Sequence, residues 1–124
     1  MKYELFFVFT LFVTSQAQTN DRILLGIDHA KQELQEALHD NNHNLVNGKN
    51  IIIKDTLTAI GVAEPILFGI YTKEKIIKQR PYEIHHIDNY WVINGTLQTG
   101  FRGGTFVCII DDRTGTILRI THSK

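Results

Sequence analysis

The sequence has almost no cysteine, no surplus of charge and no long apolar run. Its 124 residues include a single cysteine, so no disulfide can form within the chain. Thirteen basic residues balance thirteen acidic ones. A general nucleic-acid binder needs a basic surface that displaces counterions from phosphates, so the balanced charge argues against that class.

The longest apolar run, Leu5–Val13, is too short for a transmembrane helix. Nine residues rise about 14 Å as a helix, against a hydrocarbon core of about 30 Å. We therefore expect no stable membrane insertion. A short core strand at the N-terminus is the alternative interpretation of this run.

The start of the chain has the three parts of a secretory signal. Lys2 is the basic start, the apolar run follows, and Ser15 and Ala17 supply small residues before a cleavage point. We expect cleavage after Ala17 and export to the periplasm or the medium. Residues 18–124 are then expected to form a single domain.

Cys108 lies inside an apolar segment that alternates like a strand. Its neighbours on the same face are Phe106 and Ile110. A reactive thiol needs an exposed, electropositive site, so we expect Cys108 to be buried in the core.

The first half of the mature chain predicts two helices. Apolar residues at steps of three and four predict one helix over residues 23–38, capped by Asn20 or Asp21. A second is expected from Asp55 or Thr56 to Tyr71. Its apolar stripe is predicted to consist of Leu57, Ile60, Ala63, Leu67, Ile70 and Tyr71. Residues 72–80 are lysine-rich and are expected to be a solvated connector, with Ile76-Ile77 available to pack the segment onto the core.

From Tyr82 onward the apolar period changes to two, which predicts strands. The four expected strands are 82–88, 90–97, 105–112 and 116–122, with a bulge at Asn94-Gly95 in the second. Short connections imply antiparallel neighbours. The predicted fold class is α+β, with two N-terminal helices packed on one face of a four-stranded antiparallel sheet.

No residue pattern predicts catalysis, a metal or a cofactor. His85 and His86 are adjacent in a strand and must point to opposite faces, so they cannot bind one metal together. His39 and His43 flank turn-forming residues without a second ligand pair nearby. The glycines of the segment 100–104 stand between strands, not before a helix as a phosphate-binding loop requires.

Several short motifs follow one another over about residues 55–124. They are Gln79-Arg80-Pro81-Tyr82, Trp91-Val92, Gly95-Thr96-Leu97, Gly103-Gly104, Gly115 and Ile117. In this order they resemble the bacterial immunity protein family with a nuclear transport factor 2-like, or cystatin-like, fold. The resemblance implies a protein that is not an enzyme and that binds and neutralises a cognate toxin protein. The balanced charge argues against an inhibitor that imitates DNA with an acidic face.

The resemblance assigns no contact residues, so the candidates follow from residue type and expected exposure. Aromatic and arginine side chains dominate protein interfaces. The candidate partner-binding residues are Tyr90, Trp91, Phe101, Arg102, His85 and His86. Whichever of Tyr90 and Trp91 points toward the helices is expected to serve the core instead.

Two other functions remain open from the sequence. A small-molecule binder or small enzyme of the same fold would place His85, His86 or Asp88 in an apolar pocket as an acid or base. An inhibitor of the cystatin type would present an exposed wedge made from loops such as residues 98–104. A pocket that contains one of these histidines and an acidic partner would favour the enzyme.

Overall fold

The computed structural model describes residues 3–4 and 21–124. The chain divides into two units, residues 1–39 and residues 40–124, which we describe separately. Apart from residues 3 and 4, the expected signal peptide lies outside the described residues. Within the described part of the chain, no helix has the length and apolar character needed to cross a membrane.

In the described part of the first unit there is one helix, α1, over Gly26–His39. The prediction that the helix starts near residue 21 is wrong, because it begins at Gly26. Gly26 has a φ of 85°, a left-handed conformation that glycine adopts without steric cost. The segment before the helix ends at this residue. The helix ends at His39, as the polar residues after it predict. Asp40 Oδ1 accepts a hydrogen bond from Asn42 N at 2.7 Å in the turn that follows.

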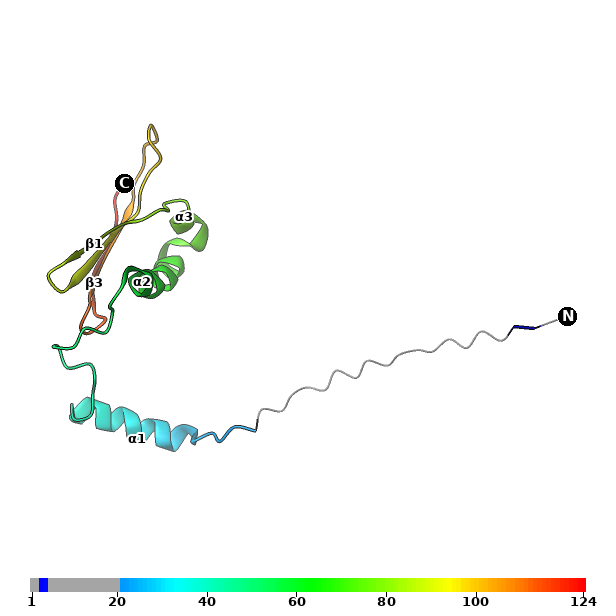
Figure 1. The fold of residues 1–124 in the computed structure, drawn as a ribbon, viewed down its shortest axis with the longest axis vertical. Coiled ribbons are helices and arrows are strands. Elements are labelled where there is room, and N and C mark those ends of the chain that lie inside the picture. The colour runs from blue at the N-terminus through cyan, green and yellow to red at the C-terminus, as the bar shows by residue number, and fades with distance from the viewer. Residues whose placement is uncertain (1–2, 5–20) are drawn as a thin grey trace. The chain divides into compact units, whose positions relative to one another are not determined.

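The second unit has helices on one side of a four-stranded sheet (Figure 1). Its elements are α2 (Thr56–Tyr71), α3 (Lys73–Ile77), β1 (Glu83–Ile87), β2 (Tyr90–Asn94), β3 (Phe106–Asp111) and β4 (Ile117–His122). All neighbouring strands are antiparallel, in the order β1-β2-β3-β4. The α+β class, with N-terminal helices and a four-stranded antiparallel sheet, is confirmed.

Helix α2 begins where the sequence predicts, and its buried face contains only part of the predicted stripe. Asp55 caps it, with Oδ1 accepting from Thr58 N at 2.7 Å, and this hydrogen bond lowers the pKa of the Asp55 carboxyl. The fully buried residues are Ala59, Ala63 and Leu67. The helix is apolar on nearly every side, so its sequence period does not select the buried face. Two members of the expected stripe, Leu57 and Ile70, are 81% and 55% exposed.

The expected connector over residues 72–80 contains a short helix, α3. Ile76 is fully buried in the core, and Gln79 is also buried, directly after the helix. The burial of Ile76 confirms the expectation for that position, whereas the connector prediction is wrong for Gln79; the lysines around them are exposed. The alternation of buried and exposed side chains gives this segment its amphipathic character.

The core lies between α2 and the facing side of the sheet. Alternate residues of β2 and β3 point into it, as the period of two predicts. The buried strand residues are Trp91, Ile93, Phe106, Cys108 and Ile110. Burial raises the pKa of the Cys108 thiol to about 11, so Cys108 is a buried, protonated core residue as expected.

Strand β2 ends at Asn94 and not at Leu97. Gly95 N still donates to Phe106 O at 2.9 Å, but Thr96 N turns away and donates to Gln79 O at 2.9 Å. The predicted bulge at Asn94-Gly95 is therefore wrong. An irregularity in pairing occurs instead between β3 and β4, at Ile109 and Ile110.

Candidate functional site

The structure does not bring the six predicted contact residues together on one surface. His85 pairs with Val92, and Tyr90 pairs with Ile87, on the face of the sheet opposite α2. Trp91 and His86 point to the helix side, and Phe101 and Arg102 lie in the loop between β2 and β3. As predicted, the two adjacent histidines point to opposite faces.

Trp91 and His86 hold the segment before α2 against the sheet. Trp91 is 6% exposed, and its Nε1 donates to Ile53 O at 2.9 Å. The His86 ring stacks on the Trp91 ring with centroids 4.3 Å apart. Of the two aromatic candidates, Trp91 is thus the one that serves the core.

The buried carboxylate of Asp112 completes this arrangement. Its Oδ2 lies 2.7 Å from His86 Nε2, and its backbone carbonyl accepts from the amides of Ile52 and Ile53. The Asp112 side chain is fully buried, and its Oδ1 has no hydrogen-bond partner among the residues that the structure describes. A buried carboxyl group without a hydrogen bond is costly, so the contact with His86 stabilises Asp112 where it lies.

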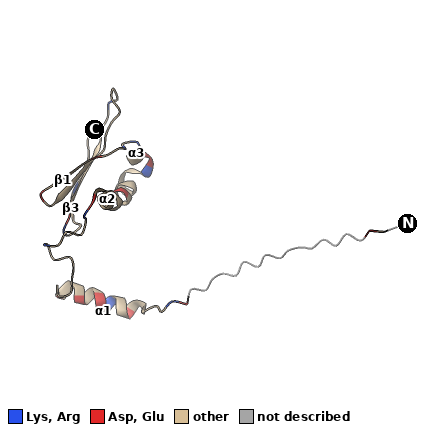
Figure 2. Ribbon diagram, viewed as in Figure 1, with Lys and Arg blue, Asp and Glu red and all other residues tan. Residues whose placement is uncertain are grey.

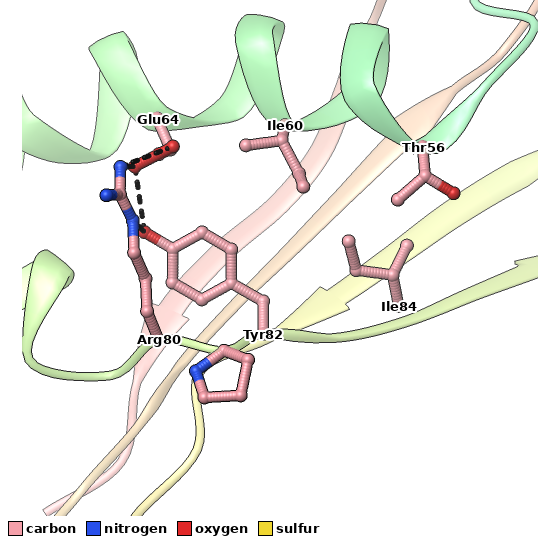
Figure 3. A pocket seen from close by; sticks show the side chains of 7 residues that line it. Thr56, Ile60, Glu64, Arg80, Tyr82 and Ile84 are labelled. Carbon is pink, nitrogen blue, oxygen red and sulfur yellow. Dashed lines mark hydrogen bonds and ion pairs between the residues drawn. The ribbon is translucent and has the colours of Figure 1, made fainter.

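A cavity of about 610 Å³ lies between α2 and the start of β1 (Figure 3). It is lined by Thr56, Ile60, Glu64, Arg80, Pro81, Tyr82 and Ile84. Arg80 Nη2 donates to both carboxylate oxygens of Glu64, and Tyr82 Oη donates to Glu64 Oε2 at 2.9 Å. Burial is the largest cause of the raised pKa of Tyr82.

Sequence reasoning missed this cavity. Glu64 lies on α2 while Arg80 and Tyr82 lie 16 and 18 residues later, so no local spacing reveals the cluster. The resemblance motif Gln79-Arg80-Pro81-Tyr82 was the only signal at this place. The Glu64 carboxylate is occupied by three donated hydrogen bonds, which makes the cluster a structural link between α2 and β1.

The cavity contains none of the acid or base residues that we expected an enzyme of this fold to use. His85, His86 and Asp88 are all elsewhere, and His85 Nε2 lies 2.8 Å from Glu83 Oε1 on the opposite face. Among the residues that the structure describes, no group of three histidine, cysteine or acidic side chains is placed to bind a metal.

The face of the sheet opposite α2 is partly apolar. Half-buried Tyr90, Val92 and Ile109 occupy its centre, and exposed His85 and Arg119 lie on the outer strands. The helices of the second unit lie on the other side (Figure 1). This face offers the mixture of apolar centre and polar rim that protein interfaces use.

The loop between β2 and β3 forms a second exposed surface. It extends past the end of the sheet near α3 (Figure 1), and Phe101 within it is 68% exposed. Phe101 N donates to Gln98 O at 3.0 Å, which closes the turn. A cleft of about 290 Å³ lies at its base, lined by Lys78, Leu97, Gln98, Phe101 and Arg102.

Comparison with known proteins places this fold in a family. A family model described as NTF2 fold immunity protein matches residues 58–124, which is more than half of the chain. The chain belongs to the NTF2 fold immunity protein family. The matched part begins inside α2 and includes the whole sheet, the Arg80 and Tyr82 cluster and the β2–β3 loop.

Two proteins of Escherichia coli K12 are similar in sequence. Uncharacterized protein YhhH is 30% identical over 74 residues, which are 59% of this chain and 58% of that protein. Uncharacterized protein YbbC is 30% identical over 90 residues, which are 72% of this chain and 70% of that protein. The chain thus spans less than two thirds of YhhH. No solved structure matches the chain significantly.

Proposed function

We propose that this protein binds one cognate toxin protein and neutralises it by occupying the surface that the toxin needs for its activity. Membership of the NTF2 fold immunity protein family carries the proposal. Toxin binding requires no reacting group on the inhibitor, only a complementary surface that excludes water from the contact.

Two exposed surfaces support a role in protein binding. The sheet face opposite α2 has Tyr90 near its centre, and the β2–β3 loop presents Phe101 and Arg102. Aromatic and arginine side chains are the residues that most often carry binding energy at interfaces. Trp91 is excluded from this role by its burial.

Co-expression with the toxin domain encoded beside this protein tests the proposal. We expect the full chain to restore growth of cells that make the toxin, and the purified pair to form a one-to-one complex of nanomolar Kd, about −12 kcal/mol. Calorimetric titration measures the affinity, and an unrelated toxin domain is the control. Growth arrest that persists despite a soluble, folded chain would contradict the proposal.

We also propose that the protein acts after export. The support is the sequence of residues 1–17, with Lys2, an apolar run and small residues at 15 and 17. When the chain is made in a bacterial host with a C-terminal tag, we expect to find it in the periplasmic fraction. N-terminal sequencing is expected to show that it starts at Gln18. Phe9→Arg, which interrupts the apolar run, is expected to leave the full-length chain in the cytoplasm. Wild-type chain that stays in the cytoplasm with Met1 intact would refute export.

Small-molecule binding is the second candidate, and the cavity between α2 and β1 favours it. Its volume of about 610 Å³ lies within the range of ligand pockets, and Ile60 and Ile84 give it an apolar wall. If the toxin neither binds nor is blocked, a small molecule that raises the melting temperature of the wild-type chain but not of Ile84→Arg would support this candidate.

A further inference from the structure

We infer that the cleft between α3 and the β2–β3 loop is the place where an acidic segment of the cognate toxin docks. This inference rests on the proposed function and specifies the chemistry of the partner. Lys78 forms one wall of the cleft, and Arg102 lies on the loop that forms the other. No carboxylate lines the cleft, so both its charges favour an anionic side chain.

The two cations are available to a partner. Lys78 Nζ lies 3.7 Å from Glu74 Oε1, but the two side chains are 75% and 82% exposed, so solvent screens this pair. Arg102 has no ion-pair partner within the described part of the chain. Arg80, by contrast, is held by Glu64 in the other cavity and contributes little here.

The surroundings of the cleft reinforce its positive charge. Helix α3 and the residue after it contain three lysines against one glutamate, and Figure 2 shows basic residues on this helix. Lys73 lies with its Nζ 6.0 Å from the centre of the Phe68 ring, which is a weak contact. The chain as a whole is neutral, so this is a local excess and not a general property of the surface.

Apolar groups lie beside the charges. Phe101 is 68% exposed and Leu97 is 43% exposed, and both line the cleft. A carboxylate flanked by an apolar side chain would meet Lys78 and Arg102 while it covers Phe101 and Leu97. The chemistry therefore fits a protein segment that combines acidic and apolar residues.

The walls of the cleft are linked before any partner arrives. Thr96 N donates to Gln79 O, and Thr96 Oγ1 donates to Pro81 O at 2.7 Å, so the base of the loop is fastened to the segment that follows α3. Lys78 is the residue directly before Gln79. A surface that is already ordered loses less entropy on binding, which favours high affinity.

Charge reversal in the full chain tests the inference. The double variant Lys78→Glu plus Arg102→Glu is expected to weaken binding of the purified toxin domain at least tenfold, chiefly through slower association, and to reduce the dependence of Kd on salt. Phe101→Ala is expected to weaken binding at least fivefold without changing the salt dependence. Biosensor kinetics at two salt concentrations measure these quantities.

A matched control is Lys54→Glu plus Arg22→Glu, which changes the net charge equally. Both residues are exposed and neither lines the cleft. We expect this control to bind within twofold of wild type. Circular dichroism and melting temperatures establish that all variants are folded.

Each other result overturns the inference in an identifiable way. If the toxin binds wild type and both double variants equally, the cleft is not the docking place although the proposed function stands. Equal weakening by both double variants would assign the effect to net charge. A toxin-free dimer that only the Lys78 and Arg102 variant dissociates would assign the cleft to a second copy of the chain. Failure of wild type to bind would remove the proposed function itself.

Discussion

Replacing Phe106 by alanine is expected to lower the free energy of unfolding by about 3–5 kcal/mol, because it leaves a cavity at the centre of the core. Phe106 is fully buried at the start of β3. Its ring meets the Tyr82 ring edge-on, with centroids 5.1 Å apart, so the aromatic contact is lost as well. The whole free energy of unfolding of a small domain is about 5–15 kcal/mol, so the variant is expected to be close to unfolding.

Urea titration followed by tryptophan fluorescence measures this effect. The chain has a single tryptophan, Trp91, and it lies in the same core. Phe101→Ala is the matched control, because it removes the same side chain from an exposed loop position and is expected to change stability by less than about 0.5 kcal/mol. A loss below about 1 kcal/mol for Phe106→Ala would contradict the core described above.

The sheet was the part of the fold most accessible from sequence. Its residues alternate with period two and its turns are short, so strand type, order and antiparallel pairing all followed from local pattern. The same alternation correctly placed His85 and His86 on opposite faces. The predicted strand ends were less accurate, because the Thr96 amide leaves the sheet and donates to Gln79 O, a contact that no local pattern records.

Helix faces were harder to predict than helix positions. Asp55 correctly marks the start of α2, since a capping side chain is a local signal. Ala63 and Leu67 of the predicted stripe are buried, yet Leu57 is exposed while Ala59, which the stripe did not include, is buried. Small side chains allow a helix to approach a sheet closely, and that preference is visible only once the two elements are paired.

The candidate site was predictable by residue type but not by arrangement. Phe101 and Arg102 lie on an exposed loop as expected, and both line the cleft. Lys78, the other cation of the cleft, was predicted to lie in a solvated connector. The residues that form the opposite wall of the cleft are about twenty positions later in the sequence, so no local pattern links them to Lys78. The Glu64, Arg80 and Tyr82 cluster was missed for the same physical reason, since it joins separate elements.

Gln79 and Gly95 are expected to show strong energetic coupling. Gln79 is buried directly after α3, and its Oε1 accepts from Phe106 N at 2.9 Å while its Nε2 donates to Lys75 O at 3.3 Å. Gln79→Ala leaves the buried Phe106 amide without a partner and is expected to cost about 1–3 kcal/mol. A Cβ at Gly95 would lie 2.1 Å from Gln79 Oε1, so Gly95→Ala is expected to cost about 1–3 kcal/mol through overpacking.

The double variant distinguishes this account from two independent effects. Gln79→Ala removes the nearest atom that a Cβ at position 95 would meet, the Oε1 at 2.1 Å, so the combined loss is expected to be smaller than the sum by about 1 kcal/mol. Urea unfolding of the four proteins gives the coupling, and strictly additive losses would refute the contact. Gln98→Ala, at an exposed glutamine in the same loop, is the control and is expected to leave stability unchanged. The Thr96 hydrogen bonds that fasten the loop go to the backbone carbonyl of Gln79, which alanine retains, so the Gln79 variant is expected to keep this link where it remains folded.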